Sequence, residues 1–191
     1  MCSSDLGRLM GKAGSYNIGL LNIWTDPVSS AGLPETGFSV IRVKKDILRK
    51  SAIGVIGTAR TPNGTWADSN AVFGADLSLN FFKNLETTAY YARSRTVNKT
   101  GDAESYRGRF YYNGDKYGLD MDYLKIGPDF NPEIGFLTRR GFLREFLQLR
   151  YSPRPKIKGL RRLWWDASID NIHDPRVTDP RDSKIQTRKM T

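Results

Sequence analysis

Two aspartates near the end of a hairpin-like stretch are the strongest candidates for acid–base chemistry in this sequence. Residues 106–123 read YRGRFYYNGDKYGLDMDY, so a single residue separates Asp120 from Asp122. In a strand, side chains two positions apart lie on the same face about 7 Å from each other, which is close to the separation of a glycosidase carboxylate pair. Arg107 and Arg109 repeat this spacing before the turn, and glycosidase chemistry leaves both arginines without a role.

The turn between these charges predicts a different arrangement. Asn-Gly is the strongest short turn signal, so the loop at residues 113–116 predicts a hairpin. We expect Arg109 to lie opposite Asp120. Arg107 then lies opposite Asp122, although a shift of two residues would keep the faces and change the partners. Because opposite charges across strands contribute about 0.2–1 kcal/mol each, we predict a charge-matched polar face and not a catalytic pair.

The remaining chemical candidates are isolated residues or weak motifs. His173 is the only histidine and Cys2 the only cysteine, so a shared metal site, a disulfide framework or a triad lacks the required residues. We expect His173 to lie in a solvated loop. The segments GVIGTAR and NGDKYG are followed by alternating residues instead of the helix N-terminus that a phosphate loop needs. We therefore expect no enzyme activity, no cofactor and no metal.

The charge balance favours an anionic partner. The chain of 191 residues has 30 Lys+Arg against 20 Asp+Glu, a formal net charge of +10. Nucleic acid, an anionic membrane surface or acidic ligands would each match this charge. The alternative that we keep is a soluble, basic β-sheet protein that binds nucleic acid, in which aromatic rings should share a face with the arginines. Of the four aromatic residues before the turn, only Tyr111 lies on the side of Arg107 and Arg109, so we expect no nucleic acid to bind.

Alternation of apolar and polar residues recurs along most of the chain, whereas helical periodicity is hard to find. The pattern predicts about nine strands, which are separated by loops rich in turn residues. They cover residues 16–25, 37–46, 51–60, 71–82, 85–95, 106–112, 117–123, 142–151 and 160–171.

The clearest alternation covers residues 71–81, where the odd positions are Ala, Phe, Ala, Leu, Leu and Phe. We expect a tight two-residue turn after this strand, which places Phe82 opposite Leu85. In this register Arg93 shares a polar face with Asp76.

Strand length separates two environments for the apolar rows. A soluble sandwich and a membrane barrel both have one dry and one wet face. Globular strands average about 5–6 residues, whereas barrel strands that cross a membrane need roughly 9–11. Residues 71–82 and 85–95 belong to the longer class. The pattern therefore predicts an all-β fold, an antiparallel up-and-down transmembrane β-barrel, here a partial barrel of about nine strands.

Tyrosines at the ends of the apolar rows are typical of an aromatic girdle. Tyr106 and Tyr112 are six residues apart, which at about 3.3 Å per residue and a tilt of about 40° spans roughly 15 Å of membrane height. This is less than the apolar band of roughly 25 Å, so the two tyrosines cannot mark both membrane boundaries on one strand. No apolar run approaches the roughly 18 residues of a membrane-spanning helix.

Three segments resemble a known family: GSYNIGLLNIWTD, ETGFSVIRVKKDILRKSAIGVIGTAR and DFNPEIGFLTRRGF. They are similar to the bacterial outer-membrane barrel called domain of unknown function 5916 (DUF5916). The resemblance covers residues 12–171, and FNPEIGF (residues 130–136) is its most distinctive part. It implies a Gram-negative outer-membrane location, a closed antiparallel barrel and no established catalytic residues. Family members commonly carry a module similar to carbohydrate-binding family 9 before the barrel, so a carbohydrate ligand is expected only through an N-terminal module missing from this sequence.

The chain is expected to divide into three parts. Residues 1–11 lack the apolar core of a secretory signal and are expected to be a non-native or linker-like N-terminus. Residues 12–171 form the partial barrel domain, and residues 172–191 a loop or truncated C-terminal segment. The odd number of strands indicates an incomplete barrel, because bacterial single-chain barrels use even numbers.

These observations predict a fragment of a bacterial outer-membrane β-barrel that passes or captures a solute, with an oligosaccharide as one candidate. Its partners would be outer-membrane lipid and lipopolysaccharide, whose anionic groups we expect to balance the basic segments at residues 42–50 and 154–162. The candidate lumen-lining residues are Asp76, Arg93, Arg107, Arg109, Asp120 and Asp122. The residues expected to face lipid are Phe73, Leu77, Leu79, Tyr90, Phe110, Leu119 and Met121.

Overall fold

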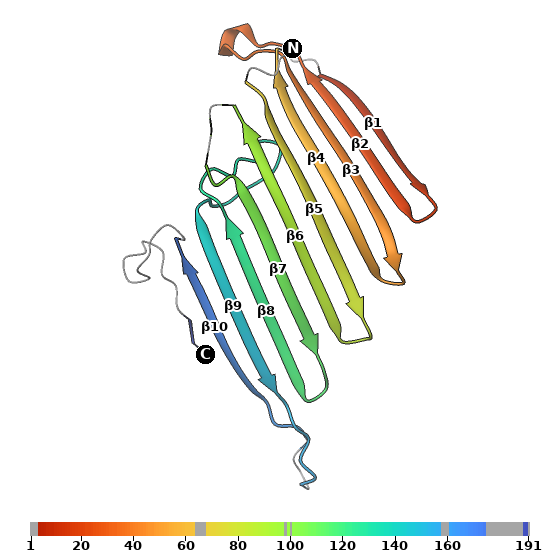
Figure 1. Ribbon diagram of the computed structural model, residues 1–191, viewed down its shortest axis with the longest axis vertical. Helices are drawn as coiled ribbons and strands as arrows, with labels where there is room; N and C mark the ends of the chain where they lie inside the picture. The colour runs from red at the N-terminus through yellow and green to blue at the C-terminus, as the bar shows by residue number, and fades with distance from the viewer. Residues whose placement is uncertain are drawn as a thin grey trace.

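Ten long strands and one short strand form a single sheet in the computed structural model, which describes residues 4–63, 68–97, 99, 101–157, 161–174 and 189–190. The strands follow one another in space in the order of the sequence (Figure 1). Their bounds are β1 Ser4–Ala13, β2 Tyr16–Thr25, β3 Thr36–Leu48, β4 Ser51–Pro62, β5 Asn70–Phe81, β6 Leu85–Thr96, β7 Glu104–Asn113, β8 Tyr117–Ile126, β9 Phe142–Tyr151, β10 Trp165–His173 and β11 Lys189–Met190.

Every pair of neighbouring strands is antiparallel, so the sheet is an up-and-down meander. This confirms the predicted all-β, antiparallel arrangement. The sheet is open, not closed into a barrel: among the described residues, β1 pairs only with β2 and β11 pairs only with β10. The alternation of apolar and polar residues explains the strands, because it allows each of them to present two different faces.

Helical structure contributes little to the part of the chain that the structure describes. A short 3-10 helix, η1 (Ser29–Ala31), lies between β2 and β3. No helix of the described residues has the length and apolar character needed to cross a membrane.

The connections differ between the two ends of the sheet. At the end that we call the short-turn end, two or three residues join β1 to β2, β3 to β4, β5 to β6 and β7 to β8. Gly14 has a φ of 60° in the first of these turns, a conformation that glycine adopts without steric cost. At the opposite, long-loop end, residues 127–141 connect β8 to β9. The exception is the longer connection 152–164 between β9 and β10, which lies at the short-turn end.

The N-terminal segment differs from its expected structure. Residues 1–11 are expected to be linker-like, whereas Ser4–Ala13 form β1 and pair with β2 along their whole length. Leu6 and Met10 project to one face of this strand and Leu9 to the other. The segment therefore lacks the alternation from which strands are predicted. It is a strand because its backbone pairs with β2.

The C-terminal strands also differ from expectation. The last long strand is expected to begin at residue 160 and end at residue 171, whereas β10 covers Trp165–His173. His173 is thus the last residue of a strand and does not lie in a loop. Lys189 and Met190 lie in the expected C-terminal loop but pair with β10 as β11.

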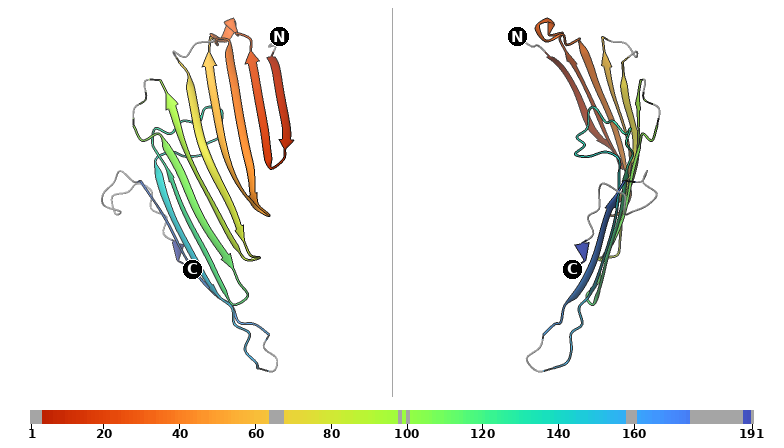
Figure 2. Two further views of the ribbon diagram at one scale, coloured as in Figure 1. Left: turned by 45° about the vertical axis from the view of Figure 1, so that its right-hand side comes forward. Right: turned by 90° about the vertical axis from the view of Figure 1, so that its left-hand side faces the viewer.

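The sheet is curved (Figure 2). Its two faces carry alternate residues of each strand. Residues 127–141 lie on the hollow side, which we call the concave face; the other side is the convex face. Even-numbered residues of β1, β3 to β6 and β8 to β10 belong to the concave face, together with odd-numbered residues of β2 and β7. The buried apolar cluster of Val72, Ile126 and Phe130 lies on the concave face.

Candidate functional site

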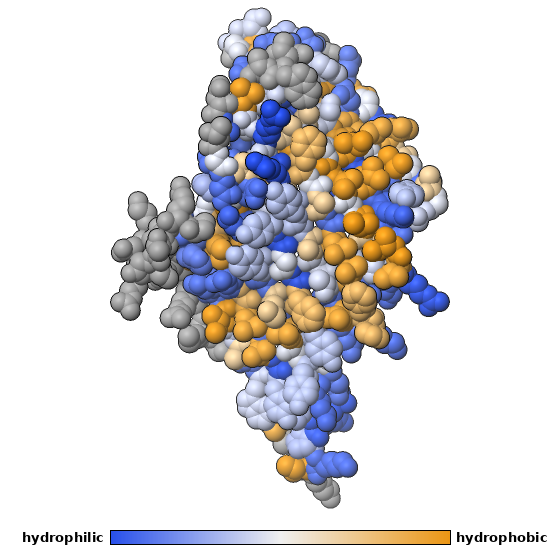
Figure 3. Space-filling view, viewed as in Figure 1, coloured by the Kyte–Doolittle hydropathy of each residue, from blue (hydrophilic) through white to orange (hydrophobic). Residues whose placement is uncertain are grey.

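The convex face carries large apolar side chains that no second layer covers. Its exposed residues include Ile41, Val55, Phe73, Met121 and Leu149, each between 48% and 66% exposed. In Figure 3 the hydrophobic colour covers β2 to β5 and continues as a band across the strands that follow. Monomeric soluble proteins rarely expose contiguous apolar patches of more than a few hundred Å², so this face indicates contact with an apolar partner.

Aromatic residues border the apolar band. At the short-turn end, Tyr117, Tyr151 and Trp165 lie in register on three adjacent strands, and successive rings stack at centroid distances of 5.3 Å and 5.7 Å. Nearer the long-loop end, Tyr106 and Tyr123 stack at 6.1 Å. Two such rows on one face are typical of the girdles of membrane barrels.

The hairpin at residues 106–123 forms the predicted ion pairs in a different register. Arg109 lies opposite Asp122 along the backbone, and the whole pairing is shifted by two residues from the expected one. The long arginine side chains reach diagonally across this shift. Arg109 Nη2 is 2.6 Å from Asp120 Oδ2, and Arg107 Nη2 is 2.6 Å from Asp122 Oδ2. The predicted partners and the predicted face are therefore correct, whereas the register is wrong.

Both ion pairs are bidentate. The Nε–H of Arg107 donates to Asp122 Oδ1 at 2.7 Å, and the Nε–H of Arg109 donates to Asp120 Oδ1 at 2.9 Å. Two parallel hydrogen bonds fix the orientation of both groups as well as their charge. The Asp122 side chain is only 6% exposed, so this carboxylate depends on Arg107 for compensation of its buried charge.

Two further pairs extend the row of charges over the concave face. Arg42 of β3 pairs with Asp76 of β5, which is one of the candidate residues. Arg144 of β9 donates to both carboxylate oxygens of Asp170 on β10, at 2.9 Å and 2.8 Å. Arg42, Arg144 and Asp170 are not among the candidates predicted from sequence. Their even positions on alternating strands are the available signal, and it becomes usable only when the pairing of neighbouring strands is known.

Arg93 is the one candidate residue that the structure places on the other face. Phe81, not Phe82, lies opposite Leu85, so β5 and β6 are shifted by one residue from the expected pairing. A shift of one residue moves every side chain to the opposite face. Arg93 therefore lies opposite Phe73 on the convex face, and the expectation that it shares a face with Asp76 is wrong.

The same shift moves Tyr90, which is expected to face lipid, to the concave face. Tyr90 lies opposite Asp76 and Arg107, and its hydroxyl is 3.1 Å from Ser105 Oγ. A second aromatic residue of this face, Tyr111, lies with its ring 5.3 Å from the guanidinium of Arg109. The concave face thus combines ion pairs with aromatic rings.

Residues 127–141 cover part of the concave face through an apolar anchor. Phe130 is 6% exposed and packs in a buried cluster with Val72 of β5 and Ile126 of β8. Leu137 of the same segment packs against this cluster. The connection from β8 to β9 is therefore folded back onto the sheet.

Asn131 supplies a polar anchor beside Phe130. Its backbone N–H donates to Ser94 Oγ at 2.9 Å, and its carbonyl oxygen accepts a hydrogen bond from Asn70 Nδ2 at 2.8 Å. Its side-chain Nδ2 donates to Glu133 at 2.8 Å, while its Oδ1 accepts a hydrogen bond from Arg140. These bonds lie within FNPEIGF and its surroundings, the segment to which sequence analysis assigns no role.

Glu133 ties the same segment to the sheet by charge. Its carboxylate pairs with Arg60, which projects from β4 on the concave face. Arg60 also donates a hydrogen bond to the backbone carbonyl of Asp68. The segment 127–141 is thus fastened to β4, β5 and β6 as well as to its own strand β8.

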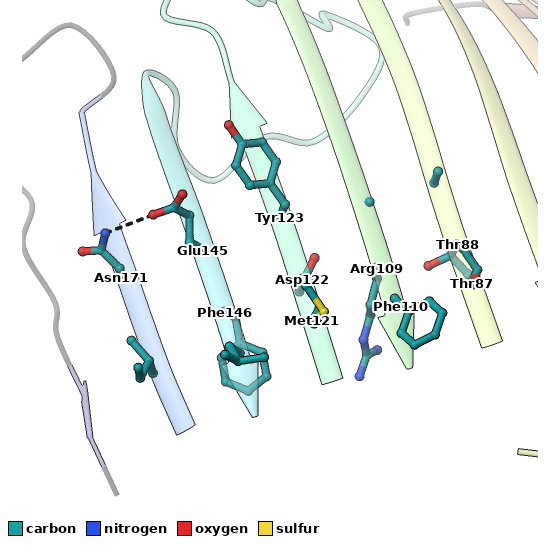
Figure 4. Close-up of a pocket in the computed structure, with 14 residues that line it drawn as sticks. Thr87, Thr88, Arg109, Phe110, Met121, Asp122, Tyr123, Glu145, Phe146 and Asn171 are labelled. Atoms are coloured by element: carbon teal, nitrogen blue, oxygen red, sulfur yellow. Dashed lines mark hydrogen bonds between the residues drawn. The ribbon is translucent and has the colours of Figure 1, made fainter. Parts of the chain in front are cut away.

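The convex face is not smooth. A shallow depression of about 590 Å³ lies around Gly108, and side chains from β6 to β10 line it (Figure 4). Phe110, Met121 and Tyr123 border it, and Asn171 Nδ2 donates to Glu145 Oε2 at 3.2 Å at its edge. A Cβ at Gly108 would have no heavy atom within 4 Å, so the missing side chain contributes to the hollow, whose lining is mostly apolar.

The two acidic candidates are already engaged by arginines. Asp120 and Asp122 each accept two hydrogen bonds from an arginine. Within the described part of the chain, no group of three or more His, Cys, Asp or Glu residues could hold a metal ion. The arrangement can line a polar surface and can bind hydroxyl or charged groups of a solute through hydrogen bonds.

Comparison with known proteins adds no relative. No protein-family model matches the chain, and the searches of curated proteins and of solved structures give no match.

Proposed function

We propose that this chain forms part of the wall of a bacterial outer-membrane β-barrel similar to the DUF5916 barrels, with the convex face in lipid and the concave face toward a water-filled lumen. The observation that carries the proposal is the exposed apolar band with aromatic borders, on the opposite side of the same strands from the ion pairs. The long strands contain 9 to 13 residues, enough to cross the hydrocarbon core of a membrane. Further strands would close the sheet, because an unpaired sheet edge is not tolerated in lipid.

The two ends of the sheet give this barrel wall a direction. Outer-membrane barrels have short periplasmic turns and longer extracellular loops. The short-turn end would therefore face the periplasm, and the long-loop end with residues 127–141 would face outward. On this model the inward-folded segment narrows the lumen on the extracellular side.

The lumen surface supports passage or capture of a polar solute, with an oligosaccharide as the candidate that we favour. Arg107 and Arg109, whose side chains are 39% and 41% exposed, would present guanidinium edges to hydroxyl groups, and Tyr111 would add an apolar ring beside them. Because the arginines hold both aspartates, a role in the wall explains this cluster better than acid–base catalysis does. The balance of signs also argues against a surface for nucleic acid, since these cations already have anionic partners.

Flotation with lipid vesicles tests the membrane location. The full chain, unfolded in urea and diluted into phosphatidylcholine vesicles, is expected to float with the lipid, to resist an alkaline wash and to gain β-structure by circular dichroism. Diluted without lipid or detergent, it is expected to precipitate because the convex face remains exposed. A chain that stays soluble and folded without lipid, and binds an oligonucleotide with a steep salt dependence, would instead support the nucleic-acid alternative.

Solute binding is tested on the vesicle-inserted chain by equilibrium dialysis with a neutral and an acidic oligosaccharide. The expected result is retention that Tyr111→Ala lowers several-fold, whereas Tyr151→Ala on the convex face leaves it unchanged. Equal effects of the two substitutions would contradict binding at the concave face.

A further inference from the structure

Cationic side chains gather on the convex face at the long-loop end, where sequence analysis does not expect them. Arg93 and Arg95 are successive outward residues of β6, and Lys99 follows in the loop after this strand. All three are exposed. In Figure 3 a strongly hydrophilic patch lies over this end of β6, beside the hydrophobic surface of β2 to β5.

These cations have weak or no anionic partners in the protein. Arg93 Nη1 is 3.9 Å from Glu104, at the limit of an ion pair. Within the described chain, Arg95 and Lys99 form no ion pair. The neighbouring Lys125, in contrast, is 2.8 Å from Asp102 and lies over the ring of Tyr106.

The three cations border a groove with an apolar floor. The groove has a volume of about 870 Å³, and its floor includes Phe73 and Ala75 of β5 with Tyr91 of β6. Phe73 is 66% exposed and Tyr91 45% exposed. A ligand that fits both parts of the groove must therefore carry anionic groups next to hydrocarbon.

The basic segments expected to meet anionic lipid lie at the other end of the sheet. Residues 42–50 cover the end of β3 and the turn into β4. The described residues of 154–162 belong to the connection between β9 and β10. Both segments are at the short-turn end of the sheet, so neither provides cations at the long-loop end, where Arg93 and Arg95 lie.

We infer that Arg93, Arg95 and Lys99 form a binding site for the phosphate groups of a phosphorylated glycolipid in the outer leaflet, with an acyl chain of this lipid lying over Phe73 and Ala75. This inference rests on the proposed membrane location and orientation. A guanidinium on a lipid-facing surface costs much less near the interface than at the midplane, and Tyr91 marks the interface one position before Arg93 on this face. Arginine binds phosphate oxygens through two parallel hydrogen bonds.

The test is a titration of the full chain, folded in zwitterionic detergent, with fluorescent lipid A that carries both phosphates. Anisotropy reports binding. The double substitution Arg93→Gln with Arg95→Gln is expected to weaken binding about thirtyfold, since each cation near an anionic surface contributes a factor of roughly five. The matched control is Lys45→Gln, because Lys45 is also an exposed cation of the convex face but lies beside Tyr16 at the short-turn end. It is expected to change binding less than about twofold.

Three results would overturn the site: unchanged binding by the double variant, equal binding of dephosphorylated lipid A, or full competition by inorganic phosphate. The last would assign the cations to a free anion. The variant Arg93→Lys with Arg95→Lys changes the same two side chains but keeps their positive charges. It should bind lipid A within about tenfold of the unsubstituted chain. A double variant that floats with phosphatidylcholine vesicles and still binds lipid A normally would contradict this site alone. A natural chain that fails to float would contradict the proposed membrane location.

Discussion

Met121 and Asp122 are neighbours in β8, and their environments are the reverse of those in a soluble protein. Met121 projects from the convex face and is 48% exposed, whereas Asp122 projects from the concave face and is 6% exposed. Charged residues are almost never fully buried without a partner, and Asp122 has one in Arg107. The contrast teaches that one face is built for contact with hydrocarbon and the other for polar groups.

The largest expected effect tests the apolar side of this contrast. Met121→Arg places a charge in the middle of the convex face, where it is expected to destabilise the lipid-folded form by about 2–4 kcal/mol. Gln148→Arg is the control, because Gln148 lies opposite Asp120 on the concave face, and it should cost less than about 1 kcal/mol. Urea unfolding of both variants in lipid vesicles measures the difference. Similar costs for the two substitutions would show that the faces do not meet different solvents.

The next effect tests the polar side. Arg107→Ala leaves the buried carboxylate of Asp122 without its bidentate partner, at a cost of about 2 kcal/mol in the free energy of unfolding. Arg154→Ala removes a pair with Asp115 in which both side chains are more than half exposed, so it should cost no more than about 1 kcal/mol. The same urea titration compares them. The double variant Arg107→Ala with Asp122→Ala should regain part of this stability. If it regains none, the destabilisation by Arg107→Ala does not come from the uncompensated charge of Asp122.

The smallest effect concerns the segment 127–141. Asn131→Ala removes the side-chain bonds to Glu133 and Arg140 and should cost about 1–1.5 kcal/mol. Local opening is expected to increase with this loss, so the segment should be cleaved several-fold faster by trypsin at Arg139 or Arg140. Thr138→Ala, a change in the same segment without such bonds in the described structure, serves as the control. An unchanged cleavage rate for Asn131→Ala would mean that other contacts hold the segment.

For the hairpin that carries Arg107 and Asp122, the sequence predicts correctly which residues share a face and which residues form ion pairs. It does not predict the register of the two strands. Face assignment needs only the alternation of residues, and it survives a shift of two positions. The long guanidinium side chains also reach the same carboxylates from the shifted register. The register itself depends on where the turn closes, and Asn113, which is expected in the loop at residues 113–116, pairs with Gly118 instead.

Arg93 shows how one turn residue can reverse a prediction. The turn after β5 contains three residues because Phe82 adopts a φ of 55° and is 93% exposed. A positive φ is rare for a bulky residue, so the sequence offers no warning of it. The extra residue reverses the two faces of β6. Arg93 therefore lies on the convex face and Tyr90 on the concave face, each opposite to its expected face.

The folding of residues 127–141 onto the sheet also cannot be predicted from local residue patterns in the sequence. Asn131 bonds to Asn70 and Ser94, which are 61 and 37 positions away in the chain. Such contacts follow from the curvature of the sheet and from the stagger of its strands. The alternation of residues within a single strand predicts neither the curvature of the sheet nor the stagger between strands.

Whether lipid covers the convex face can be measured by a nitroxide scan along β8 in phosphatidylcholine vesicles, made in a Cys2→Ser background. Single cysteines replace Leu119, Asp120, Met121, Asp122 and Tyr123 in turn, and collision with oxygen and with a water-soluble nickel complex is recorded for each. High oxygen access is expected at the odd positions and higher nickel access at Asp120, in a period of two residues. Equal access at odd and even positions, or nickel access at Met121, would contradict a convex face immersed in lipid.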